Sequence, residues 1–221
     1  MKQAVFTSVV GIGMLLVVGG LAACGEETQV AAANGPSARP LQTGQTGCYD
    51  ASGNTTDAIP CAGTGQDGAT QTGVARRYID NGDGTITAAS TGLMWEKKSA
   101  DGSLHDRGNV YSWSDAFAVF ITGINSARFA GHTDWRLPNV NELQSLANYG
   151  LSPAIDPAFN TGCVASCTVT TCSCAQSGDS WSSTTRQGSP GFAWLVGLDL
   201  GDCNTDTTRR NLSARAVRGG L

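Results

Sequence analysis

The chain has 221 residues, with 14 lysines and arginines against 18 aspartates and glutamates, and its formal net charge is −4. This length suffices for one domain of ordinary size with a leader. The acidic balance argues against a nucleic-acid-binding protein, which normally carries a basic surface. Only 14% of residues are charged, so we expect a loop-rich exported protein held by turns and hydroxyl hydrogen bonds.

The first residues have the features of an export signal, because Lys2 precedes a short apolar run that ends in small residues. The stretch "LAAC", ending at Cys24, resembles the bacterial lipobox, whose cysteine is acylated and becomes the new N-terminus after cleavage. The resemblance implies a signal peptide over residues 1–23 and a lipid (palmitate) anchor on Cys24. An ordinary cleaved signal and an uncleaved spanning anchor are the alternatives.

Two or three acyl chains hold a protein on a membrane without a spanning segment. The membrane is therefore an expected partner, through the N-terminal anchor. Position 25 is Gly rather than Asp, which by resemblance to the sorting rule of Gram-negative lipoproteins favours the outer membrane over the inner one. We expect a lipid-anchored protein of the bacterial cell envelope.

Residues 24–75 read as a lipidated, flexible tether, because they are rich in small and polar residues and lack apolar periodicity. Within them, Cys48 and Cys61 have glycine-rich flanks, and we expect a local disulfide between the two. The folded domain is predicted to span residues 76–221.

Three short apolar runs between turn-forming residues predict a hairpin or meander at the start of the domain. The runs are Tyr78-Ile79, Thr85-Ile86-Thr87 and Leu93-Met94-Trp95. The acidic turn in between, which includes Asp80 and Asp83, departs from the EF-hand calcium pattern at Gly82 and Thr91. We therefore predict a turn there and no metal.

Two amphipathic helices are predicted next, each with a capping signal. The first begins at Ser112, and its apolar stripe is Phe117, Phe120, Ile121 and Ile124. The second is capped by Asn139 and Glu142 and stops near Gly150; its stripe is Leu143, Leu146 and Ala147.

Three strands are predicted at "SWSSTT", "FAWLVGLDL" and "SARAVRG", with a loop around Gly201-Asp202. Strands, two helices, an irregular segment and further strands make an α+β pattern, in which helices pack on one side of an antiparallel sheet.

Seven blocks in order resemble the Lcl C-terminal domain family, named after the collagen-like adhesin of Legionella. They are "DNGDGTIT…STGLMW", "YSWSDAF", "GHTDWRLPNVNELQSL", "PAIDPAFN", "SWSSTT", "AWLV" and "VRGG". The likeness runs from about Asp80 to Gly220. A more distant similarity to formylglycine-generating enzymes implies a C-type lectin-like fold, with two helices on a small antiparallel sheet. Such an analogy speaks to fold more than to function.

Enzyme functions find little support in the sequence. The closing strand lacks the copper-binding cysteine pair of formylglycine-generating enzymes. His132 lies near Asp134, but no nucleophile elbow supplies a serine. We expect a non-catalytic protein without cofactor or metal, and we keep an envelope enzyme resembling sulfatase-modifying factors and a structural assembly protein as alternatives.

A binding or adhesion module is the favoured function, with a glycan or an extracellular-matrix polymer as ligand. Trp181 and Trp194, with Asp199 and Asp202 nearby, are candidates for a sugar platform, because flat rings stack on pyranose faces. The competing interpretation places all five tryptophans in the core. They are Trp95, Trp113, Trp135, Trp181 and Trp194.

The adhesin that names the family binds sulfated glycosaminoglycans, and polyanions need clustered cations. In this sequence, basic residues are concentrated only near the C-terminus, at Arg209-Arg210, Arg215 and Arg218. Arg215 and Arg218 are the ligand candidates among them. Arg136 and Arg218 are better explained as paired structural arginines, and Glu142 as a helix cap. The adhesin also suggests a homo-oligomer.

Four cysteines fall within twelve positions, at Cys163, Cys167, Cys172 and Cys174. An oxidising compartment favours disulfides, and the spacing lacks the usual zinc knuckles; a metal site and redox activity are the alternatives. Because Cys172 and Cys174 are too close for an easy mutual bond, each is expected to reach back to Cys163 or Cys167. Cys203 is then unpaired.

Overall fold

A computed structural model describes residues 40–50, 58–176 and 178–219 of the chain. The predicted signal peptide, Cys24 and the first part of the predicted tether lie outside the described residues. Among the residues that are described, no helix has the length and apolar character needed to cross a membrane.

The N-terminal part of the described chain contains a small disulfide-bonded unit. Strand β1 (Cys48–Tyr49) pairs antiparallel with β2 (Ala58–Ile59), and the predicted disulfide joins Cys48 to Cys61. The short helix α2 (Asp67–Thr70) follows. The segment predicted as a tether thus has defined backbone structure in its described part. Turns and polar side chains supply its hydrogen bonds, and such bonds leave no apolar periodicity in the sequence.

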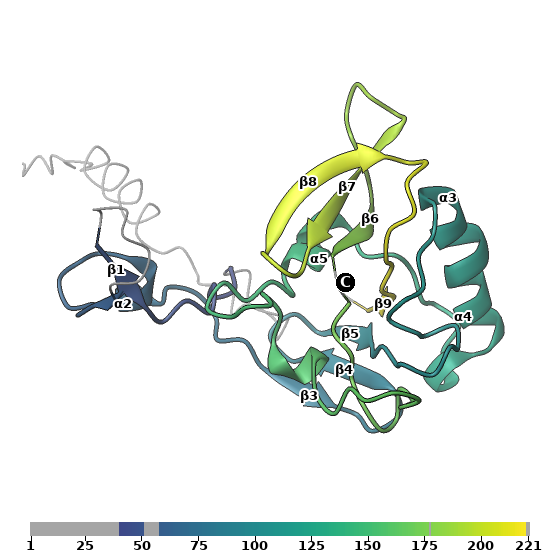
Figure 1. The fold of residues 1–221 in the computed structure, drawn as a ribbon, viewed down its shortest axis with the longest axis horizontal. Coiled ribbons are helices and arrows are strands. Elements are labelled where there is room, and N and C mark those ends of the chain that lie inside the picture. Colours follow the sequence, from purple (N-terminus) through teal and green to yellow (C-terminus); the bar gives the residue numbers. More distant parts are fainter. Residues whose placement is uncertain (1–39, 51–57, 177, 220–221) are drawn as a thin grey trace, which may run out of the picture. The chain divides into compact units, whose positions relative to one another are not determined.

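Four antiparallel strands form a sheet in the order β3-β4-β5-β9 (Figure 1). Their bounds are β3 (Tyr78–Asp80), β4 (Thr85–Ala88), β5 (Leu93–Glu96) and β9 (Val217–Arg218). The first three are the predicted meander. Asp80 and Asp83 each accept a hydrogen bond from the backbone N–H two residues later, which makes the acidic stretch a turn.

The first predicted helix is confirmed, with an irregular centre. It runs without a break through α3 (Trp113–Asp115), the π-helical stretch η1 (Ala116–Ile121) and α4 (Thr122–Ser126). Ser112 caps it by accepting a hydrogen bond from the Asp115 N–H. The Thr122 N–H and hydroxyl both bond the carbonyl of Phe117, five residues earlier, and these bonds hold the π turn.

The second predicted helix is α5 (Val140–Gln144), and it is shorter than the sequence indicates. Asn139 and Glu142 form the complete capping box. The helix ends well before Gly150 because Ala147 joins a β-bridge with Ile155. The predicted stripe is nevertheless buried. The described residues also include two single 3-10 turns, η2 (Phe129–Gly131) and η3 (Pro157–Phe159).

A second sheet has three antiparallel strands in the order β6-β7-β8 (Figure 1). They are β6 (Asp179–Thr185), β7 (Phe192–Gly197) and β8 (Asp202–Thr207). The prediction for β8 is wrong, because this segment was expected to be a loop. Its residues are polar and partly exposed, as suits an edge strand, so it lacks the alternation that indicates a strand. The "SARAVRG" segment instead supplies β9 to the other sheet.

The apolar core consists of two clusters. One contains Trp95 and the stripe of α5; the other contains Trp135 and Trp181, packed between the helix α3–η1–α4 and the second sheet. Trp113 and Trp194 are only partly buried, so the interpretation of all five tryptophans as core holds for three. The architecture is α+β, with few helices on small antiparallel sheets, as predicted.

Candidate functional site

A groove of about 480 Å³ lies between α5 and the β7–β8 hairpin, and it is the best-formed candidate site in the described part of the chain. Helix α5 supplies one wall, the loop after it supplies Tyr149, and the hairpin supplies the other wall. The lining residues are Val140, Asn141, Gln144, Tyr149, Trp194, Gly201 and Cys203. An indole and a phenol with amide side chains between them can hold a polar ligand that has an apolar face.

Strand alternation places the Trp194 side chain in the groove. Ala193 and Leu195, its neighbours on β7, are buried in the core cluster around Trp181. Successive side chains of a strand point to opposite faces, so Trp194 faces away from that core and lines the groove. The sequence candidate Trp194 is thus placed at a surface where a ligand can reach it.

Polar contacts fix the floor of the groove. The Gln144 amide donates to the Gly201 carbonyl at 2.9 Å and also to the Tyr149 hydroxyl, which itself donates to Gly201 at 3.0 Å. The Gln144 Oε1 atom is buried and has no hydrogen-bond partner among the described residues. A buried acceptor without a partner carries a desolvation cost, and its burial keeps it from direct contact with a ligand in the groove. The sequence analysis did not select Gln144 or Tyr149, because neither lies in a recognisable motif.

The N-terminal segment supports Tyr149 from outside the groove. The Tyr149 N–H donates to the Thr43 carbonyl at 2.9 Å, and the Gln45 side chain reaches the Tyr149 carbonyl. Gly150 packs so closely on Gly44 that a Cβ on it would lie 2.2 Å from the Gly44 carbonyl oxygen. The described end of the predicted tether therefore helps to position one wall of the groove.

Acidic side chains flank the hairpin end of the groove. Asp202 lies between two lining residues, and a Cβ placed on Gly197 would come within 3.1 Å of carboxylate oxygens of Asp179 and Asp199 and nearer still to Asp202. Burial, together with the charges of Asp202 and Asp199, raises the pKa of Asp179. Burial and Asp202 likewise raise the pKa of the Cys203 thiol. The surroundings therefore disfavour an anionic ligand and a reactive thiolate.

Two predicted ligand residues are inaccessible to a surface ligand. Trp181 is fully buried, and its Nε1 donates to the Tyr111 carbonyl at 2.9 Å. Arg215 is fully buried, and it donates to the carbonyls of Glu96 and Cys174. Both expectations failed because a lone aromatic or basic residue in an alternating pattern does not reveal which face it occupies.

The remaining arginines with predicted roles are engaged in ion pairs. Arg218 bonds both carboxylate oxygens of Asp134, at 2.8 and 3.1 Å. Arg136 bonds both oxygens of Glu142, at 2.8 and 2.7 Å, while Glu142 also caps α5. The structural roles predicted for Arg136, Arg218 and Glu142 are thus confirmed, and Asp134 faces Arg218 as its partner.

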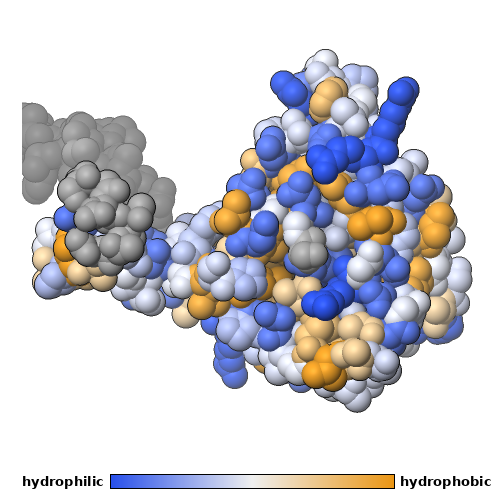
Figure 2. Space-filling view, viewed as in Figure 1, coloured by the Kyte–Doolittle hydropathy of each residue, from blue (hydrophilic) through white to orange (hydrophobic). Residues whose placement is uncertain are grey.

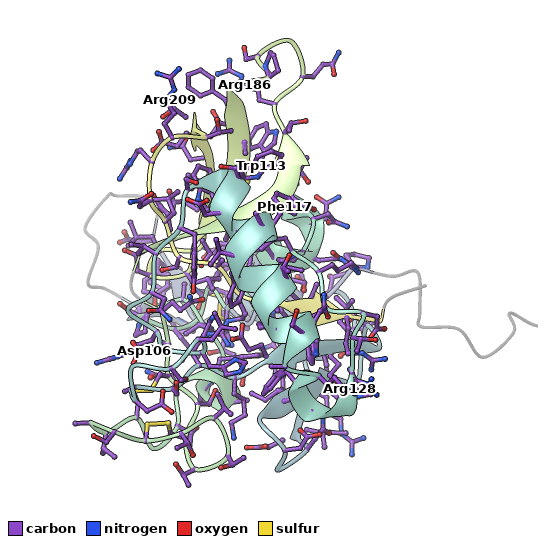
Figure 3. All side chains as sticks on the ribbon, turned by 90° about the vertical axis from the view of Figure 1, so that its right-hand side faces the viewer. Asp106, Trp113, Phe117, Arg128, Arg186 and Arg209 are labelled. Atoms are coloured by element: carbon purple, nitrogen blue, oxygen red, sulfur yellow. A yellow bond between two sulfur atoms is a disulfide. The ribbon has the colours of Figure 1, made fainter. Side chains whose placement is uncertain are left out.

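Exposed cations are spread over the surface. Arg210 is paired with Asp206, whereas Arg209 is exposed. Figure 3 places Arg186 and Arg209 at one end of the long helix and Arg128 at the opposite end. On the face seen in Figure 2, hydrophobic residues form small separate patches among hydrophilic ones. This surface suits a local polar ligand better than an extended polyanion.

A buried ionic cluster lies beneath β9, formed by Glu96, Lys98, His105 and Arg215. Lys98 Nζ and His105 Nδ1 lie 3.0 and 2.7 Å from Glu96 Oε1, and the Ala216 N–H donates to Glu96 Oε2. Burial works to raise the pKa of Glu96, but Lys98 and His105 outweigh it and hold the pKa below its usual range. Sequence reasoning missed this cluster, because β5 ends at Glu96 and Lys98 meets its carboxylate only in the folded chain.

The cysteine cluster forms two disulfides, as predicted. Cys163 is bonded to Cys174 and Cys167 to Cys172, so each late cysteine reaches back to an early one. Cys203 is the free cysteine among the described residues, and it is exposed at the groove.

Residues 84–218 match the family model of the Lcl C-terminal domain. The matched segment covers more than half of the chain and contains every residue that lines the groove. It also contains the ionic cluster and the four clustered cysteines. A search of curated proteins finds no significant match.

Proposed function

The chain belongs to the Lcl C-terminal domain family, and from that premise we propose that it is a cell-envelope lipoprotein whose domain acts as a non-catalytic binding or adhesion module. The family indicates an extracellular or envelope-associated protein. The observation that supports binding is the groove, in which Trp194 and Tyr149 line a ligand-sized space together with the amide residues Asn141 and Gln144. The C-type lectin-like fold is part of this proposal, in line with the small antiparallel sheets.

The anchor and its location complete the proposal. The lipobox-like "LAAC" supports acylation of Cys24, and Gly25 supports transfer to the outer membrane. The domain is then presented to the surroundings of the membrane on a short N-terminal segment. A homo-oligomer would present several copies of a weak site, and linked sites bind one polymer with higher avidity than a single site does.

The ligand class that fits the groove best is a neutral saccharide. A pyranose has an apolar face for the Trp194 indole and hydroxyls for the Gln144 amide, the Asn141 amide and the Tyr149 phenol. Sulfated or carboxylated sugars would meet the acidic side chains beside Gly201. A catalytic dyad of His132 and Asp134 gains no support, since both oxygens of Asp134 bond Arg218.

Trp194→Ala is expected to weaken saccharide binding at least about tenfold, because the stacking surface disappears. The measurement applies the full chain, in mild detergent, to an array of neutral oligosaccharides derived from glucans, galactans and chitin. Phe192→Ala is the matched control, since Phe192 is a partly buried aromatic on the same strand outside the groove. Equal binding by both variants, or no binding by the parent chain, would refute the proposal.

Heparin is expected to bind poorly, because the basic residues are buried, paired or dispersed. We expect no retention of the full chain on a heparin column at about 150 mM salt, where screening leaves only clustered cations effective. Retention that persists to about 300 mM salt and is lost in Arg209→Ala would show instead that the C-terminal arginines bind polyanions.

A further inference from the structure

The four clustered cysteines bring their sulfur atoms into one compact group, which we call the sulfur quartet. The Sγ atoms of Cys163, Cys167 and Cys174 all lie within 4.8 Å of one another. Across the two disulfides, Cys174 Sγ lies 3.8 Å from Cys167 Sγ and 3.8 Å from Cys172 Sγ. In a tetrahedral zinc site with Zn–S bonds of about 2.3 Å, neighbouring sulfurs are about 3.8 Å apart. Two of the non-bonded sulfur distances thus equal that of a zinc tetrathiolate, and Cys163 Sγ and Cys167 Sγ lie within 4.8 Å of each other.

Backbone hydrogen bonds hold the quartet in place independently of its disulfides. The Cys174 N–H donates to the Lys98 carbonyl at 2.8 Å, and the Ala100 N–H donates to the Cys167 carbonyl at 2.9 Å. Ser166 returns a bond to Ala100, and Thr161 and Ser173 exchange two bonds as a β-bridge. None of these bonds involves a sulfur atom, so opening the disulfides does not break any of them directly. We therefore expect the four thiols to stay close together in the reduced protein.

The surroundings favour negative charge on the sulfurs. The fully buried Arg215 guanidinium donates to the Cys174 carbonyl at 3.2 Å. Lys98 is also fully buried; its backbone carbonyl accepts a bond from the Cys174 N–H, and its ammonium bonds Glu96. Glu96 supplies one negative charge against these two positive charges, so the set carries a net charge of +1 when His105 is neutral. The Arg215 Nε is also buried without a hydrogen-bond partner among the described residues. A zinc tetrathiolate carries two negative charges, and this excess of positive charge would stabilise it.

We propose that the sulfur quartet is a redox-controlled binding site for a thiophilic divalent cation of the zinc class. In the oxidised protein the two disulfides close the site. Each disulfide accepts two electrons and two protons from a dithiol, which becomes a cyclic disulfide, and four thiols result. One Zn²⁺ then displaces four protons to solvent and takes four sulfur ligands, giving a centre of charge −2. This inference does not depend on saccharide binding at the groove.

The test uses the full chain in mild detergent, reduced with a phosphine. One phosphine and one water convert each disulfide to two thiols and a phosphine oxide, and the phosphine competes weakly for metal. Co²⁺ is added as a spectroscopic probe, followed by Zn²⁺. We expect one Co²⁺ per chain with the intense visible bands of a tetrahedral thiolate site, displacement of Co²⁺ by one equivalent of Zn²⁺, and no such bands before reduction.

The chain offers matched control variants. A variant in which Cys24, Cys48, Cys61 and Cys203 are all replaced by serine retains only the quartet, and it should keep the full signal. Cys167→Ser combined with Cys172→Ser leaves two quartet sulfurs, and it should bind Zn²⁺ at least about 100-fold more weakly. The second variant keeps Cys48 and Cys61, so it also reports what an isolated pair of thiols can bind.

Three outcomes would overturn the proposal. The first is a reduced chain, folded by circular dichroism, that shows no tetrahedral cobalt spectrum. The second is a signal that is equally strong in the Cys167→Ser/Cys172→Ser variant or in urea, since binding would then need no assembled quartet. A chain that unfolds on reduction and does not refold with Zn²⁺ also contradicts it, because the backbone bonds would have failed to hold the site.

Discussion

Glu96→Gln is expected to lower the free energy of unfolding by roughly 3–5 kcal/mol at pH 7, because it removes the carboxylate that pairs with Lys98 and His105 in the buried ionic cluster. The substitution preserves size and leaves the Lys98 ammonium and the Arg215 guanidinium without a counter-charge. It also weakens the bond from the Ala216 N–H that fixes the chain entering β9.

Urea denaturation followed by tryptophan fluorescence measures this loss, since Trp95 and Trp181 are fully buried. Asp206→Asn is the control, because it breaks an ion pair with Arg210, whose side chain is 60% exposed; a surface pair of this kind contributes about 1 kcal/mol or less. Equal losses of unfolding free energy in the two variants would show that the buried cluster stabilises the fold no more than a surface ion pair does.

Local signals predicted the elements that depend on local chemistry. The caps at Ser112 and Asn139 formed because a side-chain oxygen satisfies a free N–H of the first turn, and the meander formed between Asx turns. Strand β8 was missed because an exposed edge strand needs no apolar alternation. The pairing of β9 with β5 was also missed, since a contact between distant parts of the sequence leaves no local trace.

The candidate site was predictable only in part. Trp194 could be chosen as a candidate because flat rings stack on sugars, yet the equally plausible Trp181 points into the core. Tyr149 and Gln144 come from the end of α5 and meet Trp194 only through tertiary packing. The sequence analysis correctly excluded a bond between Cys172 and Cys174, because the two are too close along the chain. The closeness of the two disulfides to Lys98 and Arg215 required the fold.

The free energy of unfolding is expected to rise by about 2 kcal/mol between pH 7.5 and pH 9.5, a direction set by Lys98. Burial lowers the pKa of Lys98 from its usual 10.5 to about 8, and Arg215 lowers it further, while Glu96 opposes the shift. Between these two values the unfolded chain keeps a proton that the folded chain has released. The unfolded state therefore binds more protons, and raising the pH shifts the equilibrium toward the folded state.

Other titratable groups with shifted pKa values titrate mainly outside the range from pH 7.5 to pH 9.5, or can be replaced by substitution. Arg215, whose pKa burial lowers to about 10, and Tyr78, whose pKa burial raises above 10, both titrate at higher pH. Glu96 titrates in acid. Cys203 works in the opposite direction above pH 9, because its pKa is raised, so the measurement uses a Cys203→Ser background.

Urea denaturation across this pH range, in the Cys203→Ser background, compares the parent chain with Lys98→Met and Lys97→Met. Methionine does not titrate, so Lys98→Met should abolish the rise. Lys97→Met should keep it, because Lys97 bonds the half-exposed carboxylate of Asp80 rather than the buried cluster. A rise that survives in Lys98→Met would assign the pH dependence to another group. A fall in the parent chain would mean that the buried ammonium of Lys98 is stabilised by Glu96 more than burial penalises it.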